Sequence, residues 1–240
     1  MNQNPIPNRL SGAPVTPSML GVRPDTRLAT AFLTQSFVWM FAGLLLSGGV
    51  AWTVQGNEQL INFAADNFFL LVIGQLALVF VISGAISRIN ASVALLLFFV
   101  YAATLGITLG LIVSLYSGAS VVTAFLSASS MFGAAAIYGA VTKRSLAGLG
   151  GILAMGVIGL VVAMIINLFL ASTMLTWLVS IAGVVIFTAL TAYDVQRIGS
   201  GDLAAMTGSM EKAAVLGALR LYLDFINLFL FMLRLLGGRN

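Results

Sequence analysis

The stretch TAYDVQRIGSGDL, from Thr191 to Leu203, carries two acidic residues close to a strongly apolar run. A Tyr-Asp pair at Asp194 and a Gly-Ser-Gly-Asp string ending at Asp202 are the two signatures of an intramembrane aspartyl protease. Such an enzyme needs two carboxylates that share one proton at roughly 3 Å, each supplied by a different helix. The first question is therefore which acid is the partner of Asp194.

Asp202 does not meet this requirement. It is followed by LAAMTGSMEK, a connector of polar and small residues, and the neighbouring Gly199 and Gly201 predict the end of a helix. The chain also contains no His and no Cys, which excludes thiol catalysis, Ser-His proteolysis and metal sites built from His or Cys. We therefore expect no enzyme activity and no tightly bound cofactor.

Asp224 is the other acid deep inside an apolar segment, RLYLDFINLFLFMLRLL. It lies 11 residues into the last apolar run, residues 213–236, which is about 16 Å along a helix and near the middle of a bilayer. An ionised Asp at this depth costs about 2.5–3.5 kcal/mol, so such acids usually face the bundle interior and serve ion or proton pathways. Arg220 and Asn227 share a helix face with Asp224, because they lie four residues before it and three after it. We expect this polar face to point into the bundle.

Residue chemistry leaves two interpretations of these acids open. In the first, Arg220 and Asp224 form a structural ion pair, and Asp194 is an interfacial residue in contact with Arg197. In the second, Asp194 and Asp224 meet across the last two segments and share a proton, so that they titrate as a unit. A pair of the second kind is a pH sensor.

The elements that must position these acids are membrane-spanning helices. Of 240 residues, 60% are hydrophobic and 8% are charged, whereas a soluble domain has roughly 25% charged residues. Apolar runs of about 20 residues cross a bilayer, and they satisfy their backbone internally only as helices. The fold class predicted is an all-α polytopic membrane protein, a single bundle of seven transmembrane helices. The runs are residues 28–52, 67–87, 92–114, 120–141, 147–170, 174–195 and 213–236.

The distribution of basic residues predicts the orientation. The first connection carries Glu58 and Asp66 and no basic residue, whereas basic residues gather in the N-terminal segment and in the second, fourth and sixth connections. By the positive-inside rule the N-terminus is cytoplasmic, with Arg234 and Arg239 as exceptions near the exit. The net charge of +4 then reflects orientation and anionic lipid contact, not nucleic-acid binding. The basic residues that follow the rule are Arg9, Arg23, Arg27, Arg88, Lys143, Arg144, Arg197 and Lys212.

All five prolines fall within residues 1–27, a polar segment without an apolar run. We expect this segment to be a disordered cytoplasmic tail, followed by a transmembrane domain over residues 28–240. The third and fifth predicted helices contain several glycines, and we expect these residues, which have no side chain, to let neighbouring helices approach closely. They are Gly106 and Gly110 in the third helix and Gly148, Gly151, Gly156 and Gly159 in the fifth.

Two short motifs resemble the signature of the Bax inhibitor family, bacterial branch. They are Tyr193-Asp194 with Gln196 and Ile198, and the string LRLYLDFINLF from Leu219 to Phe229. The resemblance extends along residues 28–240 and implies a bundle in which the last helix is central and wrapped by the other six. It also suggests a bacterial inner membrane.

Members of this family are described as pH-sensitive calcium leak channels, opened by an aspartate pair on helices six and seven. Those positions fall on Asp194 and Asp224, which would bind permeant calcium weakly and transiently. The resemblance also implies a basic latch near the inner end of helix two, for which Arg88 is the best match. Arg220 is a second counter-charge candidate because of its spacing from Asp224. Relatives often carry a glutamate in helix two, where this chain has Gln75.

Other functions fit the same residues. Some bacterial relatives are described as regulatory proteins that bind other membrane proteins, such as a membrane protease, and conduct no ions. The tail and the small-residue faces of the third and fifth helices would then be the interaction surfaces. A proton-coupled transporter using the same acids is a further alternative, although paired inverted halves are not evident. The expected partners are the bilayer, calcium, protons and, for the regulatory function, another membrane protein.

Overall fold

The computed structural model describes residues 26–238, except for the side chains of residues 26–29 and 205. This range contains no strand, and seven of its helices are long and apolar enough to cross a membrane. They confirm the predicted all-α polytopic membrane protein. The seven are α1 (Thr26–Gln55), α3 (Phe68–Ala85), α4 (Ala91–Val113), α5 (Gly118–Val141), α6 (Gly150–Leu170), α7 (Thr173–Gly199) and α9 (Met210–Leu236). The predicted disordered tail lies outside the described residues, except that Thr26 and Arg27 already belong to α1.

Short helices occur in the connections, where the sequence predicted none. They are α2 (Glu58–Asp66), α8 (Asp202–Thr207) and a 3-10 turn, η1 (Ala147–Leu149), before α6. The side chain of Asn57 starts α2 by accepting the N–H groups of Gln59 and Leu60, at 2.9 and 3.2 Å. The connector at Asp202 is thus partly helical. Gly201 and Gly208 bound α8 with φ of 77° and 71°, which glycine adopts without strain.

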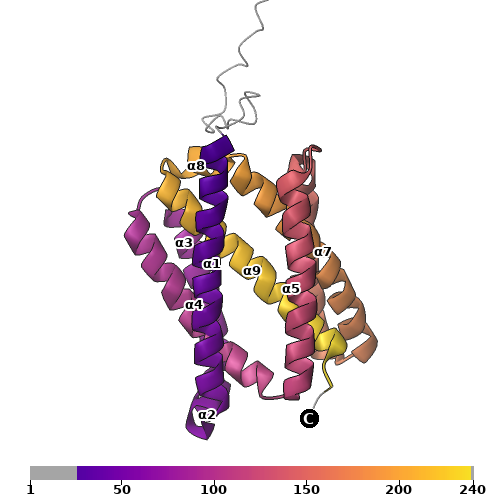
Figure 1. The fold of residues 1–240 in the computed structure, drawn as a ribbon. Coiled ribbons are helices and arrows are strands. Elements are labelled where there is room, and N and C mark those ends of the chain that lie inside the picture. The colour runs from indigo at the N-terminus through magenta and orange to yellow at the C-terminus, as the bar shows by residue number, and fades with distance from the viewer. Residues whose placement is uncertain (1–25, 239–240) are drawn as a thin grey trace, which may run out of the picture.

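The last helix, α9, is central, as expected. Its apolar span is 78% buried, against 11% for the spans of α3 and α6. It packs against α1, α4, α5, α7 and α8, and Figure 1 shows it running obliquely behind α1 and α5. The expected wrap of six helices is smaller in the structure, because α3 packs mainly on α4 and α6 mainly on α7. These two helices form an outer layer whose apolar side chains face lipid.

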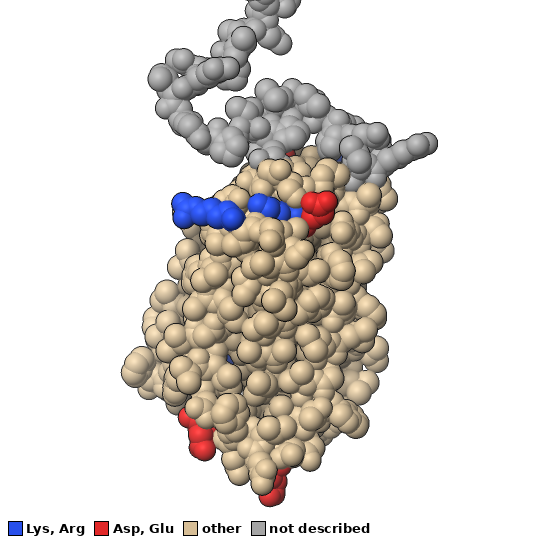
Figure 2. Space-filling model, turned by 90° about the vertical axis from the view of Figure 1, so that its left-hand side faces the viewer, with Lys and Arg blue, Asp and Glu red and all other residues tan. Residues whose placement is uncertain are grey.

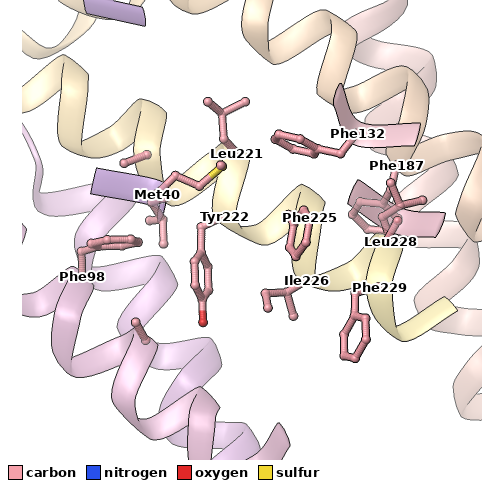
Figure 3. Close-up of a cluster of buried hydrophobic side chains, with 14 of the residues drawn as sticks. Met40, Phe98, Phe132, Phe187, Leu221, Tyr222, Phe225, Ile226, Leu228 and Phe229 are labelled. Carbon is pink, nitrogen blue, oxygen red and sulfur yellow. The ribbon is translucent and has the colours of Figure 1, made fainter. Parts of the chain in front are cut away.

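Aromatic side chains hold α9 between its neighbours (Figure 3). The ring of Phe98 in α4 meets Tyr222 edge-on, with 5.6 Å between ring centroids, and Phe132 in α5 meets Phe225 at 5.5 Å. Both geometries are favourable for aromatic pairs. The Tyr222 hydroxyl also hydrogen-bonds Ser47 of α1, whose own hydroxyl oxygen lies 2.8 Å from the carbonyl oxygen of Ala102. This contact joins α1, α4 and α9 through polar atoms inside an apolar core.

The glycines of α4 and α6 have different surroundings. A Cβ added at Gly106 would lie 2.8 Å from the carbonyl oxygen of Ser47, and one at Gly110 would lie 2.6 Å from the Cβ of Val54. The small-residue face of α4 is therefore a packing face against α1. Cβ atoms added at Gly148, Gly151 and Gly159 would meet no atom within 4 Å, whereas one at Gly156 would lie 3.1 Å from Cδ1 of Ile186 in α7. Of these four glycines of the α6 segment, three are therefore open and one is packed.

Charges separate between the two ends of the bundle. We call the end at which α1 begins the basic end, because the helix order places Arg88, Lys143, Arg144, Arg197 and Lys212 there. We call the opposite end the far end; it carries Glu58 and Asp66 of α2. On the face drawn in Figure 2, the Lys and Arg side chains gather near the basic end beside one acidic group, and acidic side chains mark the far end.

Candidate functional site: the buried acids of α7 and α9

Asp194 and Asp224 lie on two helices that pack extensively against each other. Asp194 is in the last turns of α7, five residues before its end at Gly199, and Asp224 is at the middle of α9. Their exposed fractions are 5% and 4%. Arg220, one turn before Asp224 on α9, forms an ion pair with Asp194 of α7. The structure therefore brings the two predicted acids and one arginine into a single buried site.

Arg220 binds Asp194. Its Nη1 donates to Oδ1 of Asp194 at 3.1 Å, and the two side chains are 30% and 7% exposed. Arg220 thus bridges α9 to α7 and neutralises one of the two carboxylates. It is the only ion pair among the described side chains, those of residues 30–204 and 206–238.

Asp224 is held differently. Its Oδ2 is buried and has no hydrogen-bond partner among the described residues. A charged oxygen buried in this way is costly unless a donor, a proton or a cation satisfies it. The site consequently has one carboxylate matched by an arginine and one with unused capacity.

The structural ion pair expected between Arg220 and Asp224 is not the pair that forms. In an (i, i+4) pair the acidic residue is better placed before the basic one, and here the order is reversed. Arg197 does not bind Asp194 either. Its guanidinium donates to the Tyr193 hydroxyl at 3.4 Å and to the Met206 sulfur at 3.1 Å.

The other predicted site residues lie away from these contacts. Arg88 is exposed in the turn after α3, and in the described part of the chain it forms no ion pair with either aspartate. Asn227 is half-buried and donates to the carbonyl oxygen of Leu223, one turn back on its own helix, at 2.8 Å. The structure therefore places Arg220, and not Arg88, beside the acids.

Gln196 has a role that the sequence did not predict. Its Oε1 accepts the N–H of Leu146 at 2.7 Å, and its Nε2 donates to the carbonyl oxygen of Arg144 at 2.9 Å. Gln196 thereby ties the connection between α5 and α6 to α7, two residues after Asp194. The signal in the sequence was the place of Gln196 in the Tyr-Asp motif. Residues two apart on a helix point away from each other, so Gln196 has to contact a different part of the chain from Asp194.

Gln75 occupies a position that suits an amide. Its Nε2 donates to the carbonyl oxygen of Thr104 at 3.0 Å and to the Thr108 hydroxyl at 2.7 Å, which ties α3 to α4. A glutamate carboxylate has no N–H group with which to make these two bonds. Glutamine, at the position where the resemblance implied a glutamate, is therefore matched by the local hydrogen bonding.

The donor set limits which ions this site can hold. Calcium takes six to eight oxygens at about 2.3–2.6 Å, and Asp194 and Asp224 offer at most four carboxylate oxygens. Among residues 26–238 no group of three or more acidic side chains is arranged to hold a metal ion. In this arrangement a proton or a weakly bound cation can compete with the guanidinium of Arg220 for the carboxylate oxygens.

Comparison with known proteins gives consistent matches over nearly the whole chain. The family model described as "Inhibitor of apoptosis-promoting Bax1" matches residues 29–240. The inner membrane protein YbhL of Escherichia coli strain K12 is 42% identical over 225 residues, which cover 91% of this chain and 96% of that protein. An uncharacterized protein of Deinococcus radiodurans is 42% identical, covering 87% of this chain and 91% of its own length. An uncharacterized membrane protein of Streptococcus pyogenes is 39% identical, with coverage of 88% and 86%.

Proposed function

The chain belongs to the Bax inhibitor family, and from this membership we propose that it is a pH-sensitive calcium leak channel gated by Asp194 and Asp224. The observation that carries the proposal is the buried site itself. Two carboxylates lie on facing helices, Arg220 binds the one on Asp194, and Oδ2 of Asp224 has no partner within the described residues. Acids placed in this way inside a membrane bundle are typical of ion and proton pathways.

The proposed gate is a competition for the two carboxylates. In the described conformation Arg220 occupies Asp194, and both acids are shielded from water, so we take this conformation as the closed one. A calcium ion passing between the acids has to displace the guanidinium of Arg220. A proton on either acid removes the negative charge for which the arginine and the cation compete. Opening then requires α9 to shift against α7, since these two helices carry all three groups.

Weak binding suits such a pathway. A leak needs sites that the ion leaves as easily as it enters, and two carboxylates fall short of the six to eight oxygens of a tight calcium site. Calcium is in this proposal the permeant ion and not a resident cofactor. Protons act on the same two carboxylates.

The proposal places the protein in the bacterial inner membrane with its N-terminus in the cytoplasm. The Escherichia coli relative is named as an inner membrane protein, which supports the membrane assigned here. The basic end of the bundle supports the orientation, because cytoplasmic connections carry the excess of Lys and Arg.

A second function has one observation in its favour. A regulatory protein that binds another membrane protein needs an available helix face, and the open positions at Gly148, Gly151 and Gly159 provide one. The face of α4 does not, because Gly106 and Gly110 are packed against α1. Under this alternative the two aspartates serve folding alone, and the purified chain conducts no ions.

The test is calcium flux into liposomes that contain the purified protein, measured from pH 5 to pH 8. The native chain is compared with Asp194→Asn and Asp224→Asn, each checked for a monodisperse, folded state. The gate proposed here requires a pH-dependent flux that either substitution flattens. A folded native protein that conducts nothing at any pH would exclude the channel and favour the regulatory alternative.

A further inference from the structure

A cavity of about 430 Å³ lies at the far end of the bundle, remote from the buried acids. It is formed by the end of α6, the start of α7 and the end of α9, and Tyr116 lines it from the connection between α4 and α5. Cavities of this size accommodate ligands of many atoms. Its lining includes Met164, Asn167, Leu168, Thr176 and Arg234.

Arg234 is the charged group of this cavity. Within the described part of the chain it has no carboxylate partner. It donates from Nη1 to the sulfur of Met164 at 3.6 Å, and its guanidinium carbon lies 5.9 Å from the centre of the Phe231 ring. A thioether is a weak acceptor, and an aromatic ring balances a cation only in part. Most N–H groups of Arg234 are therefore available to an anion.

The side chains of Asn167 and Thr176 in the wall are already hydrogen-bonded within the protein. The amide of Asn167 donates to the Thr176 hydroxyl at 2.7 Å, and its oxygen accepts the N–H of Ser172 at 3.0 Å. These bonds brace the turn between α6 and α7 and fix the shape of the cavity. Recognition of charge is left to Arg234, whose planar guanidinium matches the oxygens of a phosphate group.

The position of Arg234 departs from the charge pattern of the chain. The described basic residues of the connections lie at the basic end, whereas Arg234 is in the last turn of α9 at the far end. The positive-inside rule offers no reason for a cation there. A bound anion does.

The surroundings of the cavity indicate an amphiphilic ligand. Leu168 lines the cavity and is 76% exposed, and the next residue, Phe169, is 86% exposed. Both lie on α6, which belongs to the lipid-facing outer layer. We propose that this cavity binds the phosphate headgroup of an anionic phospholipid at the far surface of the membrane, with Arg234 as the phosphate ligand. The ester end of the acyl chains contacts Met164 and Leu168. This inference does not depend on calcium conduction.

The probe is phosphatidylglycerol carrying a photoreactive diazirine next to its glycerol, added to the purified full chain in neutral detergent. Labelled positions are mapped by mass spectrometry. We expect labelling within residues 164–179, and Arg234→Gln should reduce it at least fivefold. The matched control is Arg88→Gln, which removes another exposed arginine, at the basic end, and should leave that labelling unchanged.

Competition identifies the source of the phosphate. Excess unlabelled phosphatidylglycerol should displace the probe, whereas the same excess of phosphatidylcholine, and millimolar glycerol 3-phosphate, should not. Equal displacement by glycerol 3-phosphate would show that the ligand is a free phosphate ester and not a lipid. Labelling of residues 164–179 that is equal in Arg234→Gln and the native chain would overturn the site.

A second variant keeps the test valid if Arg234→Gln folds poorly. Leu168→Glu leaves Arg234 in place and adds a negative charge at the cavity mouth, on an exposed position near the end of α6. It should reduce the labelling at least fivefold by repelling the phosphate. Leu168→Gln should retain more than half of it. Equal labelling of the Glu and Gln variants would contradict a phosphate at this position.

Discussion

Arg220 pairs with Asp194 of the neighbouring helix, although Asp224 lies one turn away on its own helix. This choice makes the arginine a link between α7 and α9. It also leaves the central acid without a basic partner. A conformational change that separates α7 from α9 must therefore break the Arg220–Asp194 bond, and the charge state of Asp194 determines how strong that bond is.

Removing Arg220 should raise the calcium leak. The substitution Arg220→Gln deletes the charged donor to Asp194, and a hydrogen bond to a charged group contributes about 1.5–3 kcal/mol. Arg220 is 30% exposed, which reduces this figure to about 1.4 kcal/mol, or roughly a tenfold rise in flux. Flux into liposomes at pH 8 is the measurement. The control Arg144→Gln removes an exposed arginine from the connection between α5 and α6 that forms no ion pair with either acid, and it should change the flux less than threefold.

Acidification should raise the leak of the native chain. The Arg220–Asp194 ion pair stabilises the described closed conformation while Asp194 is ionised, and protonation of Asp194 removes its charge. Protons therefore shift the population toward the open conformation. Flux measured in steps from pH 8 to pH 5 should increase, and Asp194→Asn should be nearly independent of pH. A native flux that falls steadily over this range would contradict the assigned role of the ion pair.

The two acids should differ in their effect on stability. Asp194→Asn removes the carboxylate that Arg220 binds, which costs about 1–2 kcal/mol and lowers the melting temperature in detergent by about 3–6 °C. Asp224→Asn has nearly the same shape and loses no hydrogen bond at Oδ2, so its melting temperature should change by about 1 °C or less. Equal losses for both variants would show that the two acids are held by equivalent contacts.

The sequence predicted the helices well and their partners less well. Long apolar runs locate a membrane span directly, and the ends of the seven spans fall within a few residues of the helix ends in the structure. The expectation that Asp224 faces the bundle followed from its depth, because a charged group in the bilayer has to face the bundle, and both Asp224 and Asp194 are buried in the structure. Helices α2 and α8 were missed because they are short and have no long apolar run.

Side-chain pairing depends on distances between helices, and these cannot be deduced from the spacing of residues along one helix. Arg220 and Asp224 do lie one turn apart on the same helix, as predicted, but the arginine reaches across to Asp194 of α7. Asn227 bonds a carbonyl of its own helix, and Arg88 lies in an exposed turn. The position of Arg234 at a cavity depends on how α6, α7 and α9 meet.

Gly139 should be intolerant of substitution. A Cβ at this position of α5 would overlap the backbone of Ala192 in α7, and a backbone atom has no rotamer with which to move away. Gly139→Ala therefore has to separate two helices next to Asp194, at a cost of about 1–3 kcal/mol or more. The matched control is Gly133→Ala on the same helix, where an added Cβ meets nothing within 4 Å. Folded yield and melting temperature in detergent should fall for the first variant only.

Gln196 should determine the stability of the connection between α5 and α6. Gln196→Leu leaves the N–H of Leu146 and the carbonyl of Arg144 without their partner. Each lost bond contributes about 0.5–1.5 kcal/mol, so hydrogen exchange over residues 142–149 should accelerate about tenfold.

The variant Gln196→Glu separates the two bonds, because a carboxylate still accepts from Leu146 but cannot donate to Arg144. Its exchange rate should lie between those of the native chain and the Leu variant. Exchange at α9 should be unchanged in both variants, because α9 is held by its own aromatic contacts with α4 and α5. If residues 142–149 exchange equally fast in all three proteins, other contacts hold this connection to α7, and Gln196 does not link it to the helix that carries Asp194.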